Sequence, residues 1–307
     1  MKRLIYTTIA MLLATCISAQ VTDAEPALLE IVEEEAEEGW KTGGRFSLGF
    51  SQVSLTNWAA GGQNSLSGNG LTKMFLRYGK GTLSWENILD VGYGMVRQGE
   101  EDLIKTNDKI DFMSKLGLQA FDNWHYASLV NFRTQITPGY NYPNTSEKIS
   151  DFLAPAYLLG AIGMDYKASD KLSLFIAPVT GKITIVNDNK LSEAGAFGVD
   201  PGETTLTEFG GYVRAAFGIS ITDDVLFETK LDLFSNYLDK PQNLDVNWET
   251  MLAINVTKYI TINFSTHLIY DESVKIGIDT NDDGEPDKFG PRTQFKQLLE
   301  VGLTFKF

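Results

Sequence analysis

The stretch Arg292-Thr-Gln-Phe-Lys-Gln-Leu-Leu-Glu-Val-Gly-Leu-Thr-Phe-Lys-Phe307 decides the fold. Apolar side chains occupy most of its odd positions and polar side chains most of its even positions, with Leu298 as the main exception. Because successive side chains of a strand point to opposite faces, the stretch predicts a β-strand with one apolar and one charged face. The apolar face would meet a second sheet in a soluble sandwich. In a transmembrane β-barrel it would meet lipid, with the polar face lining the lumen.

The N-terminus has the three parts of a secretory signal peptide. Lys2 and Arg3 supply positive charge, the run from Leu4 to Ile17 is apolar, and the small residues up to Ala19 form the cleavage region. We therefore predict a signal peptide over 1–19. The apolar run is shorter than the roughly 20 residues that a membrane-spanning helix needs.

A lipoprotein signal is the alternative reading of the same segment. Leu13-Ala14-Thr15-Cys16 resembles a lipobox, although Thr15 is unusual directly before the cysteine. Since Cys16 is the only cysteine, both cleavage sites leave a mature chain without a disulfide.

Charge and composition narrow the class of protein. The net charge of -14 argues against nucleic acid or an anionic membrane surface as a partner. The content of 18 Phe, 12 Tyr, 5 Trp and 28 Gly suits a barrel, with aromatic residues at both membrane interfaces and glycines where backbones crowd. A large soluble β-protein would have a similar composition, so the choice depends on the pattern along the chain.

Twelve segments are predicted as strands, and most of them alternate clearly between apolar and polar residues. The seventh is interrupted by Pro178 and Gly181 and is the least regular. The segments lie at about 45–54, 65–78, 82–96, 108–121, 124–136, 152–167, 172–186, 205–221, 225–237, 244–256, 260–270 and 292–307.

The connections between these segments alternate between long and tight. The tight ones contain turn residues, such as Asp122-Asn123 and Thr222-Asp223-Asp224. Bacterial outer-membrane barrels have this asymmetry, with short periplasmic turns and long extracellular loops, whereas a soluble sandwich has no reason for it. The sequence therefore predicts an all-β fold: a single antiparallel up-and-down transmembrane β-barrel of about 12 strands over 45–307. An acidic periplasmic leader over 20–44 precedes it, and an aromatic last residue such as Phe307 is common in this class.

Two motifs resemble a known family. Asn57-Trp58-Ala59-Ala60-Gly61-Gly62 follows the first strand, and Gln294-Phe295-Lys296 with Gly302-Leu303-Thr304-Phe305-Lys306-Phe307 ends the chain. Together they resemble the barrel family called domain of unknown function 3078, which is typical of Bacteroidota. The resemblance implies a location in the outer membrane of a Gram-negative bacterium and brings no activity, substrate or catalytic residue with it. The first motif itself could cap the barrel mouth, constrict it or bind a ligand.

Charged residues of both signs fall on the predicted lumen face. They could interlock as a plug of ion pairs or line a narrow pore of polar walls, and a strongly selective pore would show one dominant sign. The predicted lumen charges are Glu86, Asp90, Lys109, Asp111, Lys115, Arg133, Glu208, Arg214, Glu228, Lys230, Asp232, Glu249, Lys296 and Glu300.

One loop resembles the first half of a calcium-binding loop. Asp279, Asn281 and Asp283 alternate before Gly284, and Asp287 takes the ninth position. The twelfth position is Gly290 where an EF-hand needs glutamate, so the full motif fails. A structural calcium ion and a solvated acidic turn both remain open, and no other cofactor is indicated.

Catalysis is not indicated by the polar residues of the lumen face. His125 and His267 both point inward, and Ser265 shares a face with His267, but no third partner completes a triad. We therefore predict that the protein is not an enzyme.

Two functions are compatible with this sequence. One is a narrow pore or conduit for small solutes. The other is a non-conducting scaffold or accessory subunit that presents the loops 138–150 and 187–203 to partners in an outer-membrane complex. Both imply contact with outer-membrane lipid and with the barrel-assembly machinery during insertion, and neither involves nucleic acid.

Overall fold

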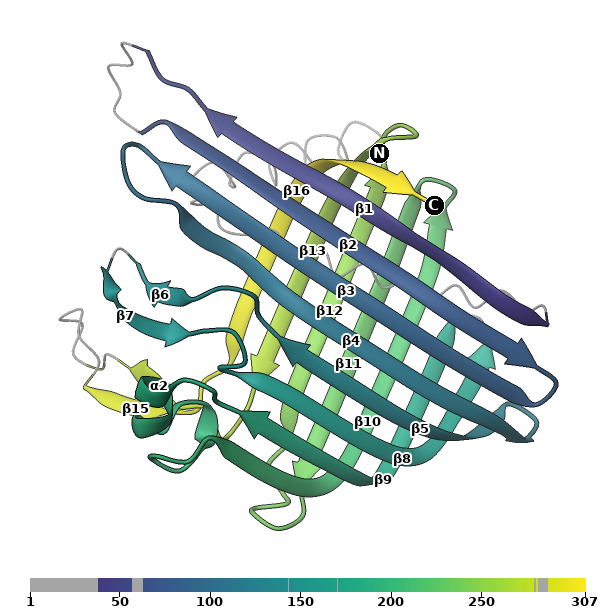
Figure 1. Ribbon diagram of the computed structural model, residues 1–307. Helices are drawn as coiled ribbons and strands as arrows, with labels where there is room; N and C mark the ends of the chain where they lie inside the picture. Colours follow the sequence, from purple (N-terminus) through teal and green to yellow (C-terminus); the bar gives the residue numbers. More distant parts are fainter. Residues whose placement is uncertain (1–37, 57–62, 143, 170, 279, 281–286) are drawn as a thin grey trace, which may run out of the picture.

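The chain folds into a closed barrel of twelve antiparallel strands (Figure 1). The structure is a computed structural model, and it describes residues 38–56, 63–142, 144–169, 171–278, 280 and 287–307. The barrel strands are β1 (Gly39–Val53), β2 (Ser65–Lys80), β3 (Leu83–Gln98), β4 (Ile104–Phe121), β5 (Trp124–Thr134), β8 (Ala156–Ser169), β9 (Leu172–Ile185), β10 (Thr205–Thr222), β11 (Val225–Asn236), β12 (Asp245–Asn255), β13 (Ile260–Tyr270) and β16 (Gln294–Lys306).

Each strand pairs with its neighbours along the chain, and β1 closes the ring by pairing with β16. This confirms the predicted fold class of an antiparallel up-and-down barrel. Tight turns join β2 to β3, β4 to β5, β8 to β9, β10 to β11 and β12 to β13. The long connections all leave from the opposite end of the barrel, which we call the long-loop end.

Three of the long connections contain short elements of their own. A hairpin of β6 (Gly139–Asn141) and β7 (Asn144–Ser150) follows β5. The helix α2 (Asn189–Glu193) and the 3-10 turn η1 (Ala196–Gly198) lie between β9 and β10, and the hairpin of β14 (Ile276–Ile278) and β15 (Lys288–Gly290) precedes β16.

Some strand boundaries differ from those predicted. The first strand starts at Gly39 rather than near 45, because its early residues pair with β2 from Gly39 opposite Gly79 onward. Glycines at 43 and 44 hide the alternation there, since they carry no side chain for either face. The sixth barrel strand starts at Ala156 rather than near 152, because Asp151 and Ala154 close a tight turn through two backbone hydrogen bonds.

The strand β9, which is the seventh strand of the barrel, is bulged where the sequence predicted its least regular strand. Its register with β8 shifts between the partners of Ile162 and Met164, next to Pro178. Proline lacks the amide hydrogen that the ladder requires, so a bulge is one of the few places where a strand tolerates it. Gly163 lies at this shift, and a Cβ atom on it would collide with the backbone of Ile176.

The barrel is apolar outside and polar inside. On β16 the outward side chains of Phe295 and Leu299 are 62% and 61% exposed, whereas the inward Leu298 and Glu300 are both 7% exposed. Large apolar surfaces exposed to water are rare on soluble proteins, and here they surround the barrel. The outer wall is therefore built for contact with hydrocarbon. No helix in the described part of the chain is long and apolar enough to cross a membrane.

Replacing Leu299 by arginine tests which medium surrounds the wall. Leu299 lies near the middle of β16, so in a bilayer the new guanidinium would enter hydrocarbon. We expect Leu299→Arg to lower the free energy of unfolding in phospholipid vesicles by about 2–4 kcal/mol, measured by guanidinium titration. The matched control is Thr293→Arg, at an exposed position just before β16, with an expected change below about 1 kcal/mol. Equal losses in the two variants would contradict lipid contact.

Candidate functional site

Side chains fill the lumen instead of lining an open channel. Every one of the twelve barrel strands contributes at least one buried side chain to the interior. Glu228 is 0% exposed, and Asn263 and Phe175 are each 1% exposed. Inward side chains of a water-filled pore would remain accessible to water, so these residues describe a packed interior.

One ion pair crosses the lumen. Lys109 on β4 lies 3.9 Å from a carboxylate oxygen of Glu249 on β12, and five strands separate β4 from β12 in both directions around the ring. Lys230 on β11 pairs with the other oxygen of Glu249 at 2.8 Å, and Asp90 on β3 lies 3.4 Å from Lys109. We call Asp90, Lys109, Lys230 and Glu249 the waist cluster. It links two opposite walls of the barrel.

A second polar bridge lies next to the waist cluster. Arg133 on β5 pairs with Asp111 at 3.3 Å. Asn247 on β12 satisfies both of its neighbours when its amide oxygen accepts from Nη1 of Arg133 (2.6 Å) and its nitrogen donates to Nε2 of His267 (2.7 Å). This bridge joins β5 to β12 and β13, so it also spans the lumen.

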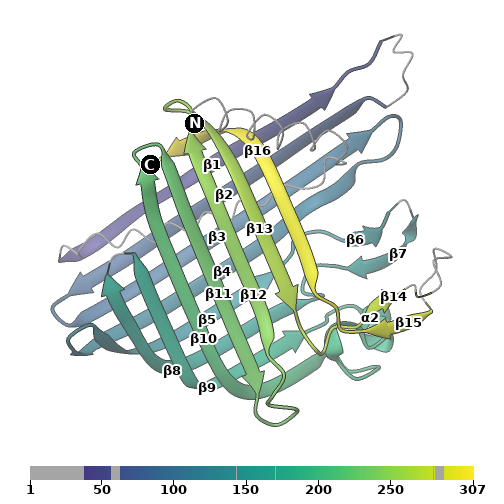
Figure 2. The ribbon, with the colours of Figure 1, turned by 180° about the vertical axis from the view of Figure 1, so that it is seen from behind.

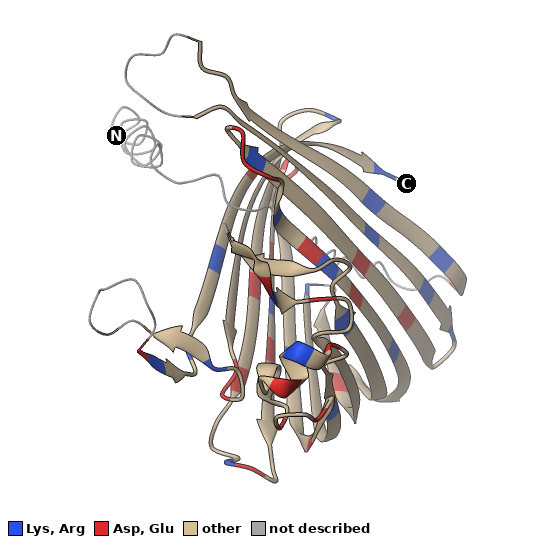
Figure 3. Cartoon of the chain, turned by 60° about the vertical axis from the view of Figure 1, so that its left-hand side comes forward, with Lys and Arg blue, Asp and Glu red and all other residues tan. Residues whose placement is uncertain are grey.

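All the predicted lumen charges lie on inward positions of the barrel, and both signs run along its strands (Figure 3). The buried ones are Lys109, Asp111, Glu208, Glu228, Lys230, Asp232, Glu249 and Glu300. The partly buried ones are Glu86, Asp90, Lys115, Arg133, Arg214 and Lys296. Their ion pairs include Arg77–Glu86, Lys115–Asp165, Arg214–Asp232 and Lys182–Glu208.

Four buried charges were missed in the sequence. Arg45, Lys73, Asp165 and Lys182 lie inside the barrel on β1, β2, β8 and β9. A strict count of alternate positions would have identified Arg45, Lys73 and Asp165, whereas the bulge in β9 shifts the parity before Lys182. Lys182 contacts three carboxylates, on Glu208, Asp245 and Asp271, between 2.8 and 3.4 Å.

An apolar cluster inside the barrel was also missed. Met113, Leu129, Phe175, Tyr212 and Phe234 pack together from β4, β5, β9, β10 and β11. The hydroxyl of Tyr212 donates to Asp232 at 2.6 Å, which ties the apolar cluster to the charged one. The barrel interior is therefore a mixed core of apolar side chains and ion pairs.

A cavity of about 280 Å³ lies beside the waist cluster. Its walls include Lys109 and Glu249 from that cluster, Arg133 and His267 from the second bridge, and Phe197 from η1. The further lining residues are Asp108, Thr134, Gln135, Ser150, Pro155 and Tyr157. Several of these residues belong to the long connections or adjoin them, so the cavity lies at the long-loop end.

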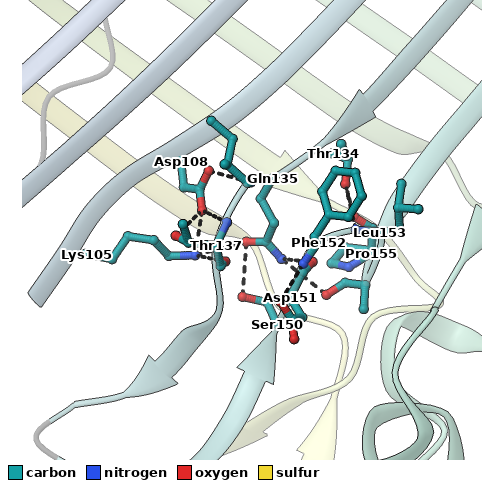
Figure 4. Close-up of polar contacts among 12 residues, drawn as sticks. Lys105, Asp108, Thr134, Gln135, Thr137, Ser150, Asp151, Phe152, Leu153 and Pro155 are labelled. Carbon is teal, nitrogen blue, oxygen red and sulfur yellow. Dashed lines mark hydrogen bonds and ion pairs between the residues drawn. The ribbon is translucent and has the colours of Figure 1, made fainter.

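A hydrogen-bond network fixes the wall of this cavity (Figure 4). Gln135 donates to the backbone oxygens of Asp151 and Ala154, and its own side-chain oxygen accepts from Lys105 and Ser150. The carboxylate of Asp108 accepts from the backbone amides of Ile136 and Thr137 at 2.6 and 2.8 Å and from Lys105 at 2.9 Å.

The loop carrying Phe197 is anchored by an apolar contact and by a salt-bridge clamp. Leu191 and Val199 pack with Val186 at the end of β9. Lys148 on β7 contacts Asp151 at 2.5 Å and Asp188, the N-cap of α2, at 2.6 Å. We call Lys148, Asp151 and Asp188 the loop clamp, because they hold the β6–β7 hairpin against α2.

Hydrogen bonds within the loop clamp shift the pKa values of its members. The hydrogen bond from Lys148 lowers the pKa of both carboxyls, Asp151 and Asp188. For Asp188 the backbone N–H of Leu191 adds to this effect. Hydrogen bonds to the two carboxylates raise the pKa of Lys148. All three groups therefore stay charged over a wider pH range than in an unfolded chain.

The residues considered for catalysis are not assembled into a catalytic site among the described residues. Nε2 of His267 bonds to Asn247, and His125 lies on β5, far around the ring from β13. Of the predicted calcium ligands, Asp279, Asn281 and Asp283 lie outside the described residues, and Asp287 accepts hydrogen bonds from Thr280. Calcium binding stays a prediction. The stretch 57–62 also lies outside the described residues.

The comparisons with known proteins give one family match. Residues 50–140 match the family described as "Protein of unknown function (DUF3078)", which confirms the predicted resemblance over that part of the chain and includes the stretch 57–62. No curated protein sequence matches the chain.

Several solved structures resemble the barrel at low identity. They include the COG4313 outer membrane channel from Pseudomonas putida F1 (12% identity, TM-score 0.41, covering 93% of this chain and all of that one). The NanC porin is 10% identical, with a TM-score of 0.38 over 86% of this chain and all of its own. The outer membrane phospholipase A from Escherichia coli is 12% identical, with a TM-score of 0.32 over 90% of this chain and 95% of its own.

Removing Glu249 tests whether the waist cluster holds the barrel together. Glu249→Ala leaves the buried ammonium groups of Lys109 and Lys230 without this carboxylate. We expect a loss of about 3–5 kcal/mol in the free energy of unfolding, measured by denaturant titration in detergent micelles. The control is Glu249→Leu combined with Lys230→Met, which removes a cation together with the anion and should recover part of the loss. A single variant as stable as the wild type would contradict a structural role.

The loop clamp predicts a one-sided pH dependence. Carboxyls with lowered pKa values stabilise the folded loop above their unfolded pKa of about 3.9, and this stabilisation is lost as the pH falls through the lower folded values. We expect amide hydrogen exchange in 144–153, corrected for intrinsic rates, to be unchanged between about pH 5 and 8 and to speed up below about pH 4. In Lys148→Met the exchange should be fast at every pH. An acid effect of equal size in that variant would contradict the clamp.

Proposed function

We propose that the protein is a conduit for small solutes in the outer membrane of a Gram-negative bacterium, with its lumen closed at the waist cluster. The observation that carries the proposal is the cavity at the long-loop end, which continues into a charged layer and not into an apolar floor. An apolar outer wall supports the membrane location. The orientation follows the usual one for such barrels, with long loops outside the cell.

The chemistry of the waist suits a closure that can open. An apolar core resists the entry of water, whereas ion pairs can exchange their partners for water at a small net cost. The contact between Lys109 and Glu249 is long at 3.9 Å, and each residue has a second partner on its own side of the lumen, Asp90 and Lys230. Separating this one crossing pair would therefore leave both charges neutralised on their own walls.

The alternative is a non-conducting scaffold or accessory subunit of an outer-membrane complex. The packed lumen favours it, and so does the fixed arrangement of the β6–β7 hairpin and α2 at the long-loop end. In that case the loops would bind partner proteins. Both proposals require outer-membrane lipid around the wall and the barrel-assembly machinery for insertion.

Conductance in planar bilayers distinguishes the two functions. We expect refolded wild-type protein to show small or rare conductance steps, and Lys109→Ala with Glu249→Ala to raise the conductance several-fold because the crossing pair is removed. The matched control is Arg77→Ala with Glu86→Ala, which removes a 2.8 Å pair between the adjacent strands β2 and β3. Wild-type conductance is expected there. If all three proteins stay silent, the scaffold function is favoured.

A further inference from the structure

Among the described residues, β1 and β16 pair with each other over only part of their length. Five ladder pairs join these strands, from Arg45 opposite Lys306 to Gly49 opposite Gly302, and Gly44 with Phe307 adds one more pair at the end of the chain. Every other pair of neighbouring strands in the described barrel aligns at least ten residue pairs. The β1–β16 seam is therefore the weakest part of the ring.

Beyond this seam the two strands diverge toward the long-loop end. Within the part of the chain that the structure describes, the ladder of β1 from Phe50 to Val53 is with β2, and that of β16 from Gln294 to Val301 is with β13. Figure 2 shows β1 and β16 separating from their crossing point near the C-terminus. We call Phe50–Val53 and Gln294–Val301 the two lips of the opening.

A hydrogen bond holds the end of the seam. Glu300 on β16 reaches across β1 and accepts a hydrogen bond from Asn69 on β2 at 3.0 Å. Gly49 makes room for this side chain, because a Cβ atom there would lie 2.6 Å from Cδ of Glu300. The opening starts directly above this contact.

Unpaired strand edges are costly in hydrocarbon, since each unsatisfied backbone group costs several kcal/mol there. Such edges persist at membrane depth where they border a water-filled space. The cavity of about 280 Å³ lies one strand away from the lip of β16, since its wall residue His267 on β13 is the strand partner of Lys296. The lips therefore separate an aqueous mouth from the bilayer.

The lips have two chemical faces. Phe50, Phe295 and Leu299 point outward and are 67%, 62% and 61% exposed, so their sides meet lipid tails. Lys296 points inward, next to His267 of the cavity wall. A molecule with a negative head and an apolar tail fits this arrangement, with its head at Lys296 and its tail between the lips.

We propose that this opening binds a single-chain anionic amphiphile, such as a long-chain carboxylate, and passes it sideways between the cavity and the outer leaflet. The packed lumen closes the axial route below the cavity, and the opening offers a lateral route at the same end of the barrel. The cavity is slightly smaller than the roughly 300–1,000 Å³ of common ligand pockets, which suits a head group and its first carbons. This inference rests on the proposed conduit function and names its substrate class and route.

Fluorescence quenching tests the proposal with a defined probe. A bimane on Ser51→Cys, an exposed inward position of the β1 lip, reports contact with 5-doxyl-stearate in phosphatidylcholine vesicles. The same label on Asn131→Cys, inside the wall where β5 pairs on both sides, is the control. We expect strong quenching at Ser51→Cys and little at Asn131→Cys. Gln294→Cys on the other lip is a second reporter, should Ser51→Cys fail to fold.

The head-group site is tested by charge. We expect 5-doxyl-stearate to reach half-maximal quenching at a concentration about 10- to 150-fold lower than its methyl ester, as for one hydrogen bond to a charged group. Lys296→Gln should make the two probes equal. If the probe quenches the label equally at Ser51→Cys and at Asn131→Cys, the wall is closed at the lip and the proposal is overturned. Equal affinities for the acid and the methyl ester in the protein with Lys296 would also overturn the proposal. The negative head group would then add nothing to binding at the lip.

The conduit function is judged separately. The conductance of the variant lacking Lys109 and Glu249 measures the axial route and does not depend on the lips. Conductance without selective quenching would therefore retain the conduit and reject the lateral site. Selective quenching in a protein that never conducts would retain the site as a purely lateral route and reject axial passage.

Discussion

The structure depends on one constraint, which is that backbone N–H and C=O groups surrounded by hydrocarbon must pair with each other. A sheet meets this constraint only by closing on itself, and here closure is made by the short contact of β1 with β16. Gly44 exchanges two backbone hydrogen bonds with Phe307 at 2.9 and 3.0 Å. The absence of a side chain at Gly44 leaves room for the ring of Phe307, which fills that space. Small residues on one strand and an aromatic residue on the other thus allow the two edges to approach.

Closure also creates the problem of what to place inside. A ring of twelve strands is larger than one that side chains fill easily and smaller than a wide porin, so its interior can be either packed or open. This chain packs it with opposite charges that reach across a flattened cross-section, as the contact between Lys109 and Glu249 shows. Because most of the buried charges pair with an opposite charge, the interior remains polar at a limited electrostatic cost. If the interior opens, water can hydrate these charged side chains. Water would not hydrate the side chains of an aliphatic core in this way.

The strands of the wall were predicted well from the sequence. Each barrel strand has an apolar outer face and a polar inner face, so its side chains alternate with a period of two. The twelve strands, the tight turns and the inward position of residues such as Glu249 follow from that period. The pairing of Lys109 with Glu249 could not be predicted, because it depends on the shape of the cross-section. The packing of Leu129 and Phe175 inside the barrel was missed for a similar reason, since parity gives direction but not how far the opposite wall lies.

The long connections and the first strand were predicted less well. The start of β1 at Gly39 was missed because Gly43 and Gly44 erase the alternation that identifies a strand. The loop clamp joins side chains from two different connections, and no local pattern around Lys148 or Asp188 indicates which loop lies next to which. The short pairing of β1 with β16 could not be predicted either. Both stretches have the alternation of ordinary strands, and the length of their pairing depends on the angle at which the two strands cross.

The position of the closing contact has a consequence for the order of assembly. Ser47 and Thr304 share a hydrogen bond of 3.0 Å although 257 residues separate them along the chain. All other strand pairs join segments adjacent in the chain, so they can form as hairpins while the ring is still open. Contacts between distant segments carry the largest entropic cost and form slowly. The polypeptide therefore passes through a curved sheet with two bare edges, which are open to pairing with other chains until the first and last strands meet.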